Sequence, residues 1–149
     1  VDAARFDEGD ELAAALAELG CERALVVCGN DELDEVSLWG ETAVFDVTRN
    51  GAIESAWTAA SFGLDECSVG DLTVTSSDRS AEIIRSILAG KRGPARDIVV
   101  ANAAAGLLAA GVADSPADGA AKAAAAIDDG RATNILTQLA AATQKFAAS

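Results

Sequence analysis

Residues Ala24–Gly29 read ALVVCG and run directly into Asn30–Glu35, NDELDE. A short Val-rich apolar run that ends at Gly is typical of a strand in a sheet covered on both faces. In open α/β sheets, ligands bind just beyond the carboxyl ends of such strands. The sequence therefore predicts a buried strand over Ala24–Gly29 in an α/β fold, with a candidate ligand-binding loop directly after it.

The loop after this strand is strongly acidic, because Asp31, Glu32, Asp34 and Glu35 follow one another closely. These carboxylates repel one another unless solvent or a cation offsets their charge. Mg²⁺ takes oxygen ligands and binds through one or two carboxylates together with substrate phosphates. We therefore predict Asp34 and Glu35 as Mg²⁺ ligands and expect Asp31 and Glu32 at the solvated edge. A solvated acidic loop without a metal is the alternative.

Charge and composition exclude several classes of function. The 149 residues include 24 acids and 11 bases, a formal net charge of −13, whereas a nucleic-acid partner requires a basic surface. The chain has no His and no Tyr, which excludes a His base and a Ser-His-Asp triad within it. Catalysis must then rest on carboxylates, backbone groups and a metal. The acidity fits either adaptation to high salt or a GC-rich genome.

The cysteines Cys21, Cys28 and Cys67 are odd in number and lack C-x-x-C spacing. This pattern suggests neither a disulfide framework nor a zinc site, and it favours free thiols in a cytoplasmic protein. Cys28 lies at the end of the predicted strand, so we expect a small core residue there and not a nucleophile.

The longest apolar tract, Ile98–Ala113, has 16 residues. That is short of the roughly 20 residues that cross a bilayer, so we expect a buried core helix and no membrane partner. Asn102 interrupts this tract and is expected to hydrogen-bond a loop backbone. Arg96 and Asp97, just before it, are expected to pair with neighbouring loops.

The remaining N-terminal pattern predicts a helix, a hairpin and a loop. Leucines at helical spacing place the helix over Asp10–Leu19, and Gly20 ends it. Ala43–Thr48 and Ala52–Thr58 alternate around Asn50-Gly51, a strong hairpin signal. Ser61–Ser77 lacks periodicity and is predicted to be loop, with Phe62 and Leu64 directed inward.

The last part of the chain is predicted to be helical. One helix spans Asp78–Leu88, a second follows Pro94 over Ala95–Ala110, and a third is capped by Ser115 and runs to Asp129. A terminal helix extends to about Phe146. In the first of these helices the residues predicted to face inward are Ile83, Ile84, Ile87 and Leu88. Asp128 and Asp129 close a helix at an end that disfavours acids, and the sequence offers no function for them.

Several segments resemble anthranilate phosphoribosyltransferases in the same order. Arg23–Ser37 resembles that family's strand, Gly, Asp-rich loop and Leu-Asp-Glu, although Glu32 stands where the family commonly has Gly. Ala81–Arg85 and Gly93–Ala105 resemble its closing helices, and Ala126–Ala132 resembles its last helix-to-helix junction. The order and spacing make the resemblance far more specific than Leu-Asp-Glu alone.

The resemblance implies the fold and the catalytic role of the chain. We expect an α/β fold, the C-terminal part of a nucleoside phosphorylase/phosphoribosyltransferase-like domain with one buried strand, a β-hairpin and several packed helices. Residues 1–149 would then be a partial phosphoribosyltransferase catalytic domain. The implied activity is transfer of the 5-phosphoribosyl group from phosphoribosyl pyrophosphate to anthranilate in tryptophan synthesis. The implied cofactor is Mg²⁺ at Asp34 and Glu35.

The resemblance covers about the last two-fifths of such an enzyme. The family's Gly-rich pyrophosphate loop, its Lys-containing loop and its anthranilate-binding Arg have no counterpart in the chain, which begins with Val and has no Met. We therefore expect a piece of a longer protein that is inactive by itself and dimeric at full length. Two rivals remain open, a pyrimidine nucleoside phosphorylase-like enzyme and a non-catalytic relative or interaction fragment of the same fold.

Overall fold

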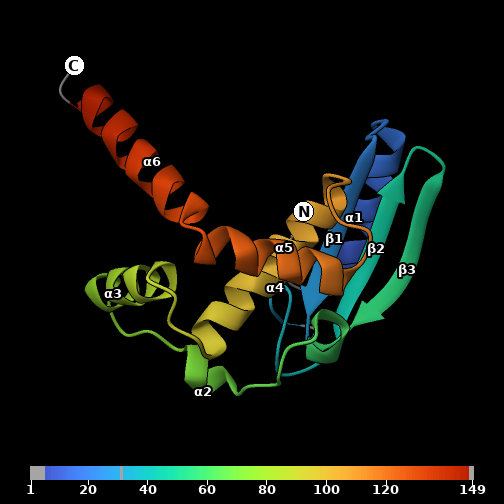
Figure 1. Cartoon of the computed structure of the whole chain (residues 1–149). Helices are drawn as coiled ribbons and strands as arrows, with labels where there is room; N and C mark the ends of the chain where they lie inside the picture. The colour runs from blue at the N-terminus through green and yellow to red at the C-terminus, as the bar shows by residue number, and fades with distance from the viewer. Residues whose placement is uncertain (1–5, 31, 148–149) are drawn as a thin grey trace.

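The computed structural model describes residues 6–30 and 32–147, and Figure 1 shows how their helices and strands are arranged. Asp31 lies outside the described residues. In chain order the elements are α1 (Phe6–Glu18), β1 (Arg23–Gly29), β2 (Thr42–Thr48), β3 (Gly51–Trp57), the 3₁₀ helix η1 (Ala59–Phe62), α2 (Val69–Leu72), α3 (Ser77–Leu88), α4 (Pro94–Ala109), α5 (Pro116–Asp128) and α6 (Arg131–Ala147).

The strands form one antiparallel sheet in the order β1-β2-β3. In its register Val26 lies opposite Phe45, and Thr48 lies opposite Gly51. Gly51 has a φ of 118°, which L side chains rarely adopt, so a glycine suits this end of the hairpin turn. The predicted hairpin is confirmed.

Both faces of β1 are covered by helices, as the Val-rich run predicted. Val26 and Cys28 face one way and pack with Phe45 in a cluster that includes Ala13 of α1. Leu25 and Val27 face the other way and belong to the main core, which contains α4 and α5. Alternate side chains of one strand thus enter two separate apolar layers. The predicted α/β fold with one buried strand is confirmed.

On the second face of the sheet α4 packs against β1, and α5 packs closely on α4. A Cβ added to Gly119 of α5 would lie 2.9 Å from the Cβ of Ala104 on α4, so the two backbones approach each other at these small residues. Val100, Ala101, Ala104, Ala105 and Leu108 of α4 are buried. The prediction of a buried core helix over this tract is confirmed. No helix in the described part of the chain has both the length and the apolarity needed to cross a membrane.

Three local predictions need correction. The segment predicted as loop over 61–77 contains the end of η1 and the four-residue helix α2, which are too short to produce a visible periodicity. The first helix begins at Phe6, before Asp10. Ile84 is 47% exposed although Ile87, three positions further along the same helix face, is buried, so α4 covers only part of this face of α3. Phe62 is buried, as predicted.

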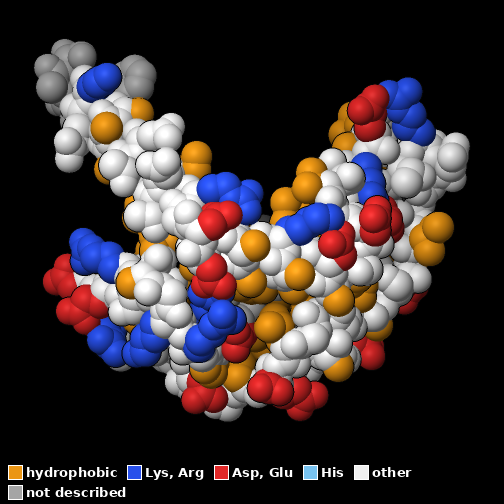
Figure 2. Space-filling model, in the orientation of Figure 1, with side chains coloured by type: hydrophobic (Ala, Val, Ile, Leu, Met, Phe, Trp, Pro, Cys, Tyr) orange, Lys and Arg blue, Asp and Glu red, His pale blue; other side chains and the backbone are white. Residues whose placement is uncertain are grey.

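The last helix, α6, projects from the rest of the molecule (Figure 1). It packs chiefly against α5, which it follows after Gly130. Ile135, Leu136 and Leu139 are each more than 40% exposed, although they recur along one side of the helix. Figure 2 shows apolar side chains along the surface of α6.

Candidate functional site

The acidic loop leaves β1 at Gly29 and returns to the sheet at Thr42. Asp34 and Glu35 are exposed, whereas Val36 and Leu38, close behind them, are fully buried. Glu32 is also exposed and accepts a hydrogen bond from the side chain of Asn30 at 3.3 Å. The structure therefore places the two predicted metal ligands side by side on the surface, next to a buried segment.

Backbone contacts hold the start of this loop against the end of β1. The N–H of Gly29 donates to Leu33 O at 2.8 Å, and the N–H of Leu33 donates to Gly29 O at 2.8 Å. Asn30 has a φ of 52°, an uncommon value that Asn tolerates better than most residues, and its N–H donates to Glu41 O at 2.7 Å. A Cβ added to Gly29 would lie 2.5 Å from Glu35 O. Only glycine at this position lets the loop return so close to the strand.

Asn102 holds the far side of the loop. Its Oδ1 accepts from the N–H of Val36 at 2.8 Å, and its Nδ2 donates to Val36 O at 3.2 Å. The prediction that Asn102 hydrogen-bonds a loop backbone is confirmed. The sequence did not indicate which loop, because the two residues are 66 positions apart.

The carboxylates of Asp34 and Glu35 offer oxygen ligands to a hard cation. Neither makes a hydrogen bond or an ion pair with any residue that the structure describes. Within the described residues, no group of three or more His, Cys, Asp or Glu side chains converges as a metal site. The chain can therefore supply two carboxylates, a donor set that fits Mg²⁺ where water and substrate phosphates complete the coordination.

A mostly apolar cavity of about 280 Å³ adjoins the loop. Leu33 and Glu35 line it from the loop, and Asp71 lines it from α2. The other lining residues, from α2, α3, α4 and their connections, are Leu72, Val74, Ser80, Ile83, Ile84, Ile87, Ala95, Ile98 and Val99. Glu35 thus stands at the rim of a recess between helices.

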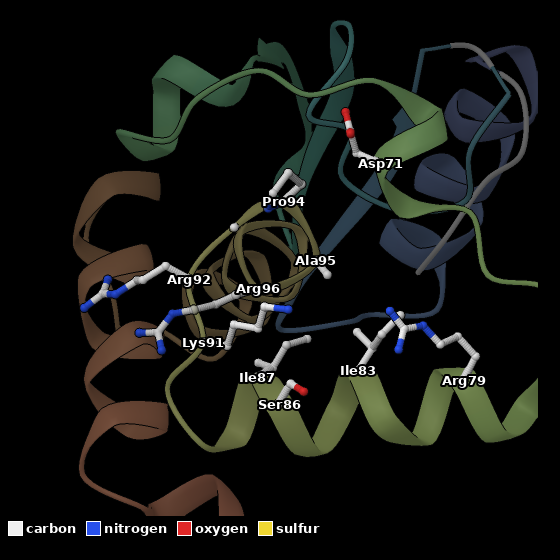
Figure 3. Close-up of a pocket in the computed structure, with 11 residues that line it drawn as sticks. Asp71, Arg79, Ile83, Ser86, Ile87, Lys91, Arg92, Pro94, Ala95 and Arg96 are labelled. Atoms are coloured by element: carbon white, nitrogen blue, oxygen red, sulfur yellow. The ribbon is translucent and has the colours of Figure 1, made fainter.

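A second cavity of about 230 Å³ shares Asp71 with the first and lies at the start of α4 (Figure 3). Four of the chain's 11 basic residues line it, namely Arg79, Lys91, Arg92 and Arg96. Figure 3 shows Lys91 and Arg79 directed into the space above α3, whereas Arg92 and Arg96 are turned toward α5. Arg79 is paired with Glu82 at 2.8 Å. Three of these four basic residues therefore have a carboxylate partner, because Arg92 and Arg96 share Asp128.

The side chains of Arg92 and Arg96 both point toward Asp128. Its two carboxylate oxygens lie 2.7 Å from Nη1 of Arg96 and 3.4 Å from Nη2 of Arg92. The Arg96 guanidinium, paired with Asp128 at 2.7 Å, holds the pKa of Asp128 below its ordinary value, and the positive charge of Arg92 acts in the same direction. The predicted pairing of Arg96 with a neighbouring loop is wrong, because its carboxylate partner stands at a helix end. The network fixes the start of α4 to the end of α5.

None of the three cysteines lies in an environment that would activate its thiol as a nucleophile. Cys21, Cys28 and Cys67 are free thiols, and Cys28 is buried in the core, as predicted. Burial raises the pKa of Cys67, and the negative charges of Asp71 and Asp97 raise it further. A thiol whose pKa is raised is a poor nucleophile, so the structure offers no activated cysteine among these three.

Comparison with known proteins supports one family. The model of the glycosyl transferase family, a/b domain, matches residues 3–133. Anthranilate phosphoribosyltransferase of Geobacter sulfurreducens is 44% identical over 136 residues, which are 91% of this chain and 39% of the relative. The chain thus spans about two-fifths of the length of the curated relatives it matches.

Solved structures agree with the sequence comparison. Anthranilate phosphoribosyltransferase from Thermus thermophilus superposes with a TM-score of 0.82 and 32% identity, covering 92% of this chain and 40% of that one. The Saccharomyces cerevisiae enzyme in complex with PRPP and Mg has a TM-score of 0.80 and 23% identity over 89% of this chain and 39% of that one, which shows a shared fold. This chain belongs to the glycosyl transferase family that has this α/β domain.

Proposed function

We propose that the chain is the C-terminal part of the catalytic domain of an anthranilate phosphoribosyltransferase. The observation that carries the proposal is the exposed Asp34–Glu35 pair at the exit of β1, within a family match that spans residues 3–133. The relatives named above are anthranilate phosphoribosyltransferases. The substrates would be phosphoribosyl pyrophosphate and anthranilate.

We assign Asp34 and Glu35 the role of Mg²⁺ ligands. A bound Mg²⁺ stabilises negative charge on the pyrophosphate oxygens as the leaving group departs. The two carboxylates would hold the cation at the surface, where the phosphates can complete its coordination. Their exposure and their lack of partners among the described residues support this assignment. The amine of anthranilate is already nucleophilic, so the absence of His in the chain is no obstacle.

Residues 1–149 alone are expected not to catalyse the reaction. Orienting two substrates contributes on the order of 7 to 11 kcal/mol in favourable cases. The relatives use a longer chain, since this one spans 39% of the first of them. A homodimer of the full-length protein and a cytoplasmic location stay predictions.

A chimeric enzyme tests the proposed function. This chain would replace the matching 136 residues of the Geobacter sulfurreducens enzyme. We expect the chimera to consume anthranilate only when phosphoribosyl pyrophosphate and Mg²⁺ are both present, as measured by the loss of anthranilate fluorescence. The same chimera with Asp34→Asn and Glu35→Gln should fold but lose Mg²⁺-dependent binding of phosphoribosyl pyrophosphate in calorimetric titration.

The chimera also separates the rival functions. Phosphorolysis of a pyrimidine nucleoside by a chimera that ignores anthranilate would favour the nucleoside phosphorylase-like alternative. A folded chimera that binds neither phosphoribosyl pyrophosphate nor Mg²⁺ would favour the non-catalytic alternative. Unchanged binding after the double substitution would remove Asp34 and Glu35 from the site.

A further inference from the structure

The Asp34–Glu35 pair lies between two anchored residues. On one side, Leu33 exchanges two backbone hydrogen bonds with Gly29, both of 2.8 Å. On the other side, both backbone polar groups of Val36 are bound by the side chain of Asn102. Only the two carboxylate residues separate these fixed points, so their backbone has little freedom to move.

Asn102 is itself held in one orientation. Its Nδ2 donates to Ile98 O, one turn earlier in α4, at 3.0 Å as well as to Val36 O. Its Oδ1 faces the N–H of Val36. If the amide were flipped, its Nδ2 would face the N–H of Val36 and its Oδ1 would face Val36 O, and neither contact would be a hydrogen bond. Only the observed orientation of the amide satisfies both groups. The side chain acts as a rigid two-point clamp.

Packing alone does not account for an amide at this position. From Ile98 to Ala109 all residues of α4 except Asn102 are apolar or Gly, and this part of the helix belongs largely to the main core. Val36, to which Asn102 binds, is fully buried, so the N–H and C=O of Val36 cannot hydrogen-bond bulk water. An apolar side chain at position 102 would leave both groups unpaired.

The clamp acts in a tightly restrained segment. The N–H of Ser37 donates to Oγ1 of Thr42 at 2.9 Å, and both residues are fully buried. Glu35 O lies so near Gly29 that a Cβ there would be 2.5 Å away. Because these contacts restrain the backbone on both sides of Val36, a movement of Val36 would also displace Glu35.

We propose that Asn102 is a positioning residue for metal binding: it fixes the backbone on which Asp34 and Glu35 present their carboxylates. The inference rests on the proposed function, since it assumes that these carboxylates hold Mg²⁺. Asn102 contacts no substrate or metal in this role. Ordering two carboxylates in advance removes an entropic cost of cation binding, and loss of such outer partners commonly weakens metal affinity by about 10–100-fold.

The test uses Mn²⁺ as a paramagnetic probe on residues 1–149. Mn²⁺ broadens nearby backbone amide signals in NMR spectra, so a titration gives the affinity at the Asp34–Glu35 loop itself. We expect Asn102→Leu, which keeps the bulk of the side chain, to weaken this affinity about tenfold or more and to accelerate hydrogen exchange of the Val36 amide. Val100→Ala is the matched control, because Val100 is buried in the same helix but lines the side toward α5. It should leave the Mn²⁺ affinity nearly unchanged.

A second variant and a second readout keep the test decisive. Asn102→Ser, which retains a small polar group, replaces Asn102→Leu if the latter does not fold. In the chimera, excess Mg²⁺ should restore turnover to the Asn102 variant but not to the Asp34→Asn, Glu35→Gln variant. Faster exchange at Val36 with unchanged Mn²⁺ affinity would overturn the positioning role while leaving the metal site intact. Absence of broadening near Asp34 in the unmodified protein would instead refute the metal site, and the positioning role with it.

Discussion

The loop between β1 and β2 differs from the helix α6 in how well it is packed, and secondary structure alone does not reveal this difference. The loop is mostly irregular, yet Val36, Ser37 and Leu38 within it are fully buried. The helix has 17 residues in regular conformation, yet Ile135 is 64% exposed and Leu139 is 59% exposed. The irregular segment is therefore the better packed of the two.

Long-range hydrogen bonds explain this difference. The loop is bound to Gly29, Thr42 and Asn102, which belong to two strands and a helix. The hydrogen bonds of α6 are mostly internal, and its large apolar side chains Ile135, Leu136 and Leu139 lack a covering layer among the described residues. Helices of globular proteins gain most of their stability from packing an apolar face, so α6 should be the less stable region. Substitutions in both regions, together with changes of pH and salt, test this contrast.

Among changes in the loop and in the attachment of α6, the largest effect is expected from Gly29→Ala. The added Cβ would lie 2.5 Å from Glu35 O and 2.9 Å from the Cβ of Ser37, both in a segment that cannot yield easily. We expect the free energy of unfolding to fall by about 1–3 kcal/mol, as for other overpacked sites. Urea denaturation followed by circular dichroism measures this loss.

Gly106→Ala is the control for that substitution. Gly106 lies within α4, and a Cβ there would meet no atom within 4 Å. Alanine should stabilise the helix by up to about 1 kcal/mol because it restricts the unfolded chain. Equal stability of the two variants would show that the loop is not tightly held against β1.

The second prediction concerns the attachment of α5, and hence α6, to the core. Asp128→Asn removes the carboxylate that faces Arg96, whose side chain is 1% exposed. A buried guanidinium without its partner is strongly unfavourable, so Tm should fall well below that of Glu82→Gln, which breaks an exposed pair on α3. Thermal unfolding at neutral pH compares the two variants directly.

The pH dependence of the Asp128 pair has a definite sign. Because Arg96 holds the pKa of Asp128 below its unfolded value, the pair contributes fully above that unfolded value, about 3.9. Its contribution is lost as the pH falls through the lower, folded value. The Tm difference between the wild type and Asp128→Asn should therefore shrink under acid conditions. A difference that grows on acidification would contradict the assigned pairing.

Local sequence signals predicted the elements that depend on neighbours in the chain. The Val-rich run over Ala24–Gly29, the turn before Gly51 and the cap at Ser115 each act through contacts a few residues apart, and the structure contains all three features. The clamp at Val36 and the pairing of Arg96 with Asp128 join residues that are far apart in sequence. An isolated polar residue shows that a partner is needed but does not identify it.

The exposure of Ile84 illustrates a second limit of the sequence. Helical periodicity indicates which residues share a face, but not whether another element covers that face. On α3 the apolar positions are divided, so that Ile87 is buried and Ile84 is exposed beside the cavity next to Glu35. The candidate metal ligands were predictable because adjacent residues supply both of them. Their anchoring was not, because it depends on tertiary contacts.

The loop between β1 and β2 is negatively charged and α6 is positively charged, so salt should affect the two regions differently. Glu32, Asp34 and Glu35 crowd the loop, whereas the stretch 131–147 contains no acid in a chain of net charge −13. Raising KCl to about 1 M shortens the Debye length to roughly 3 Å and should relieve repulsion in the loop. Tm should rise with salt, and amide exchange should slow in the loop but not in α6. A flat Tm profile would favour a GC-rich genome over halophily as the source of the acidity.

The smallest effect on stability is expected from Leu139→Gln in α6. Since Leu139 is 59% exposed, removing its apolar contacts should change the free energy of unfolding by no more than about 0.5 kcal/mol. Leu108→Ala in α4, where the side chain is 6% exposed, should cost about 2–5 kcal/mol by comparison. Exposed apolar faces promote association, so Leu139→Gln should also reduce self-association of residues 1–149 in sedimentation velocity. A loss of stability near that of Leu108→Ala would mean that α6 buries this face in solution, and the contrast between the two regions would then disappear.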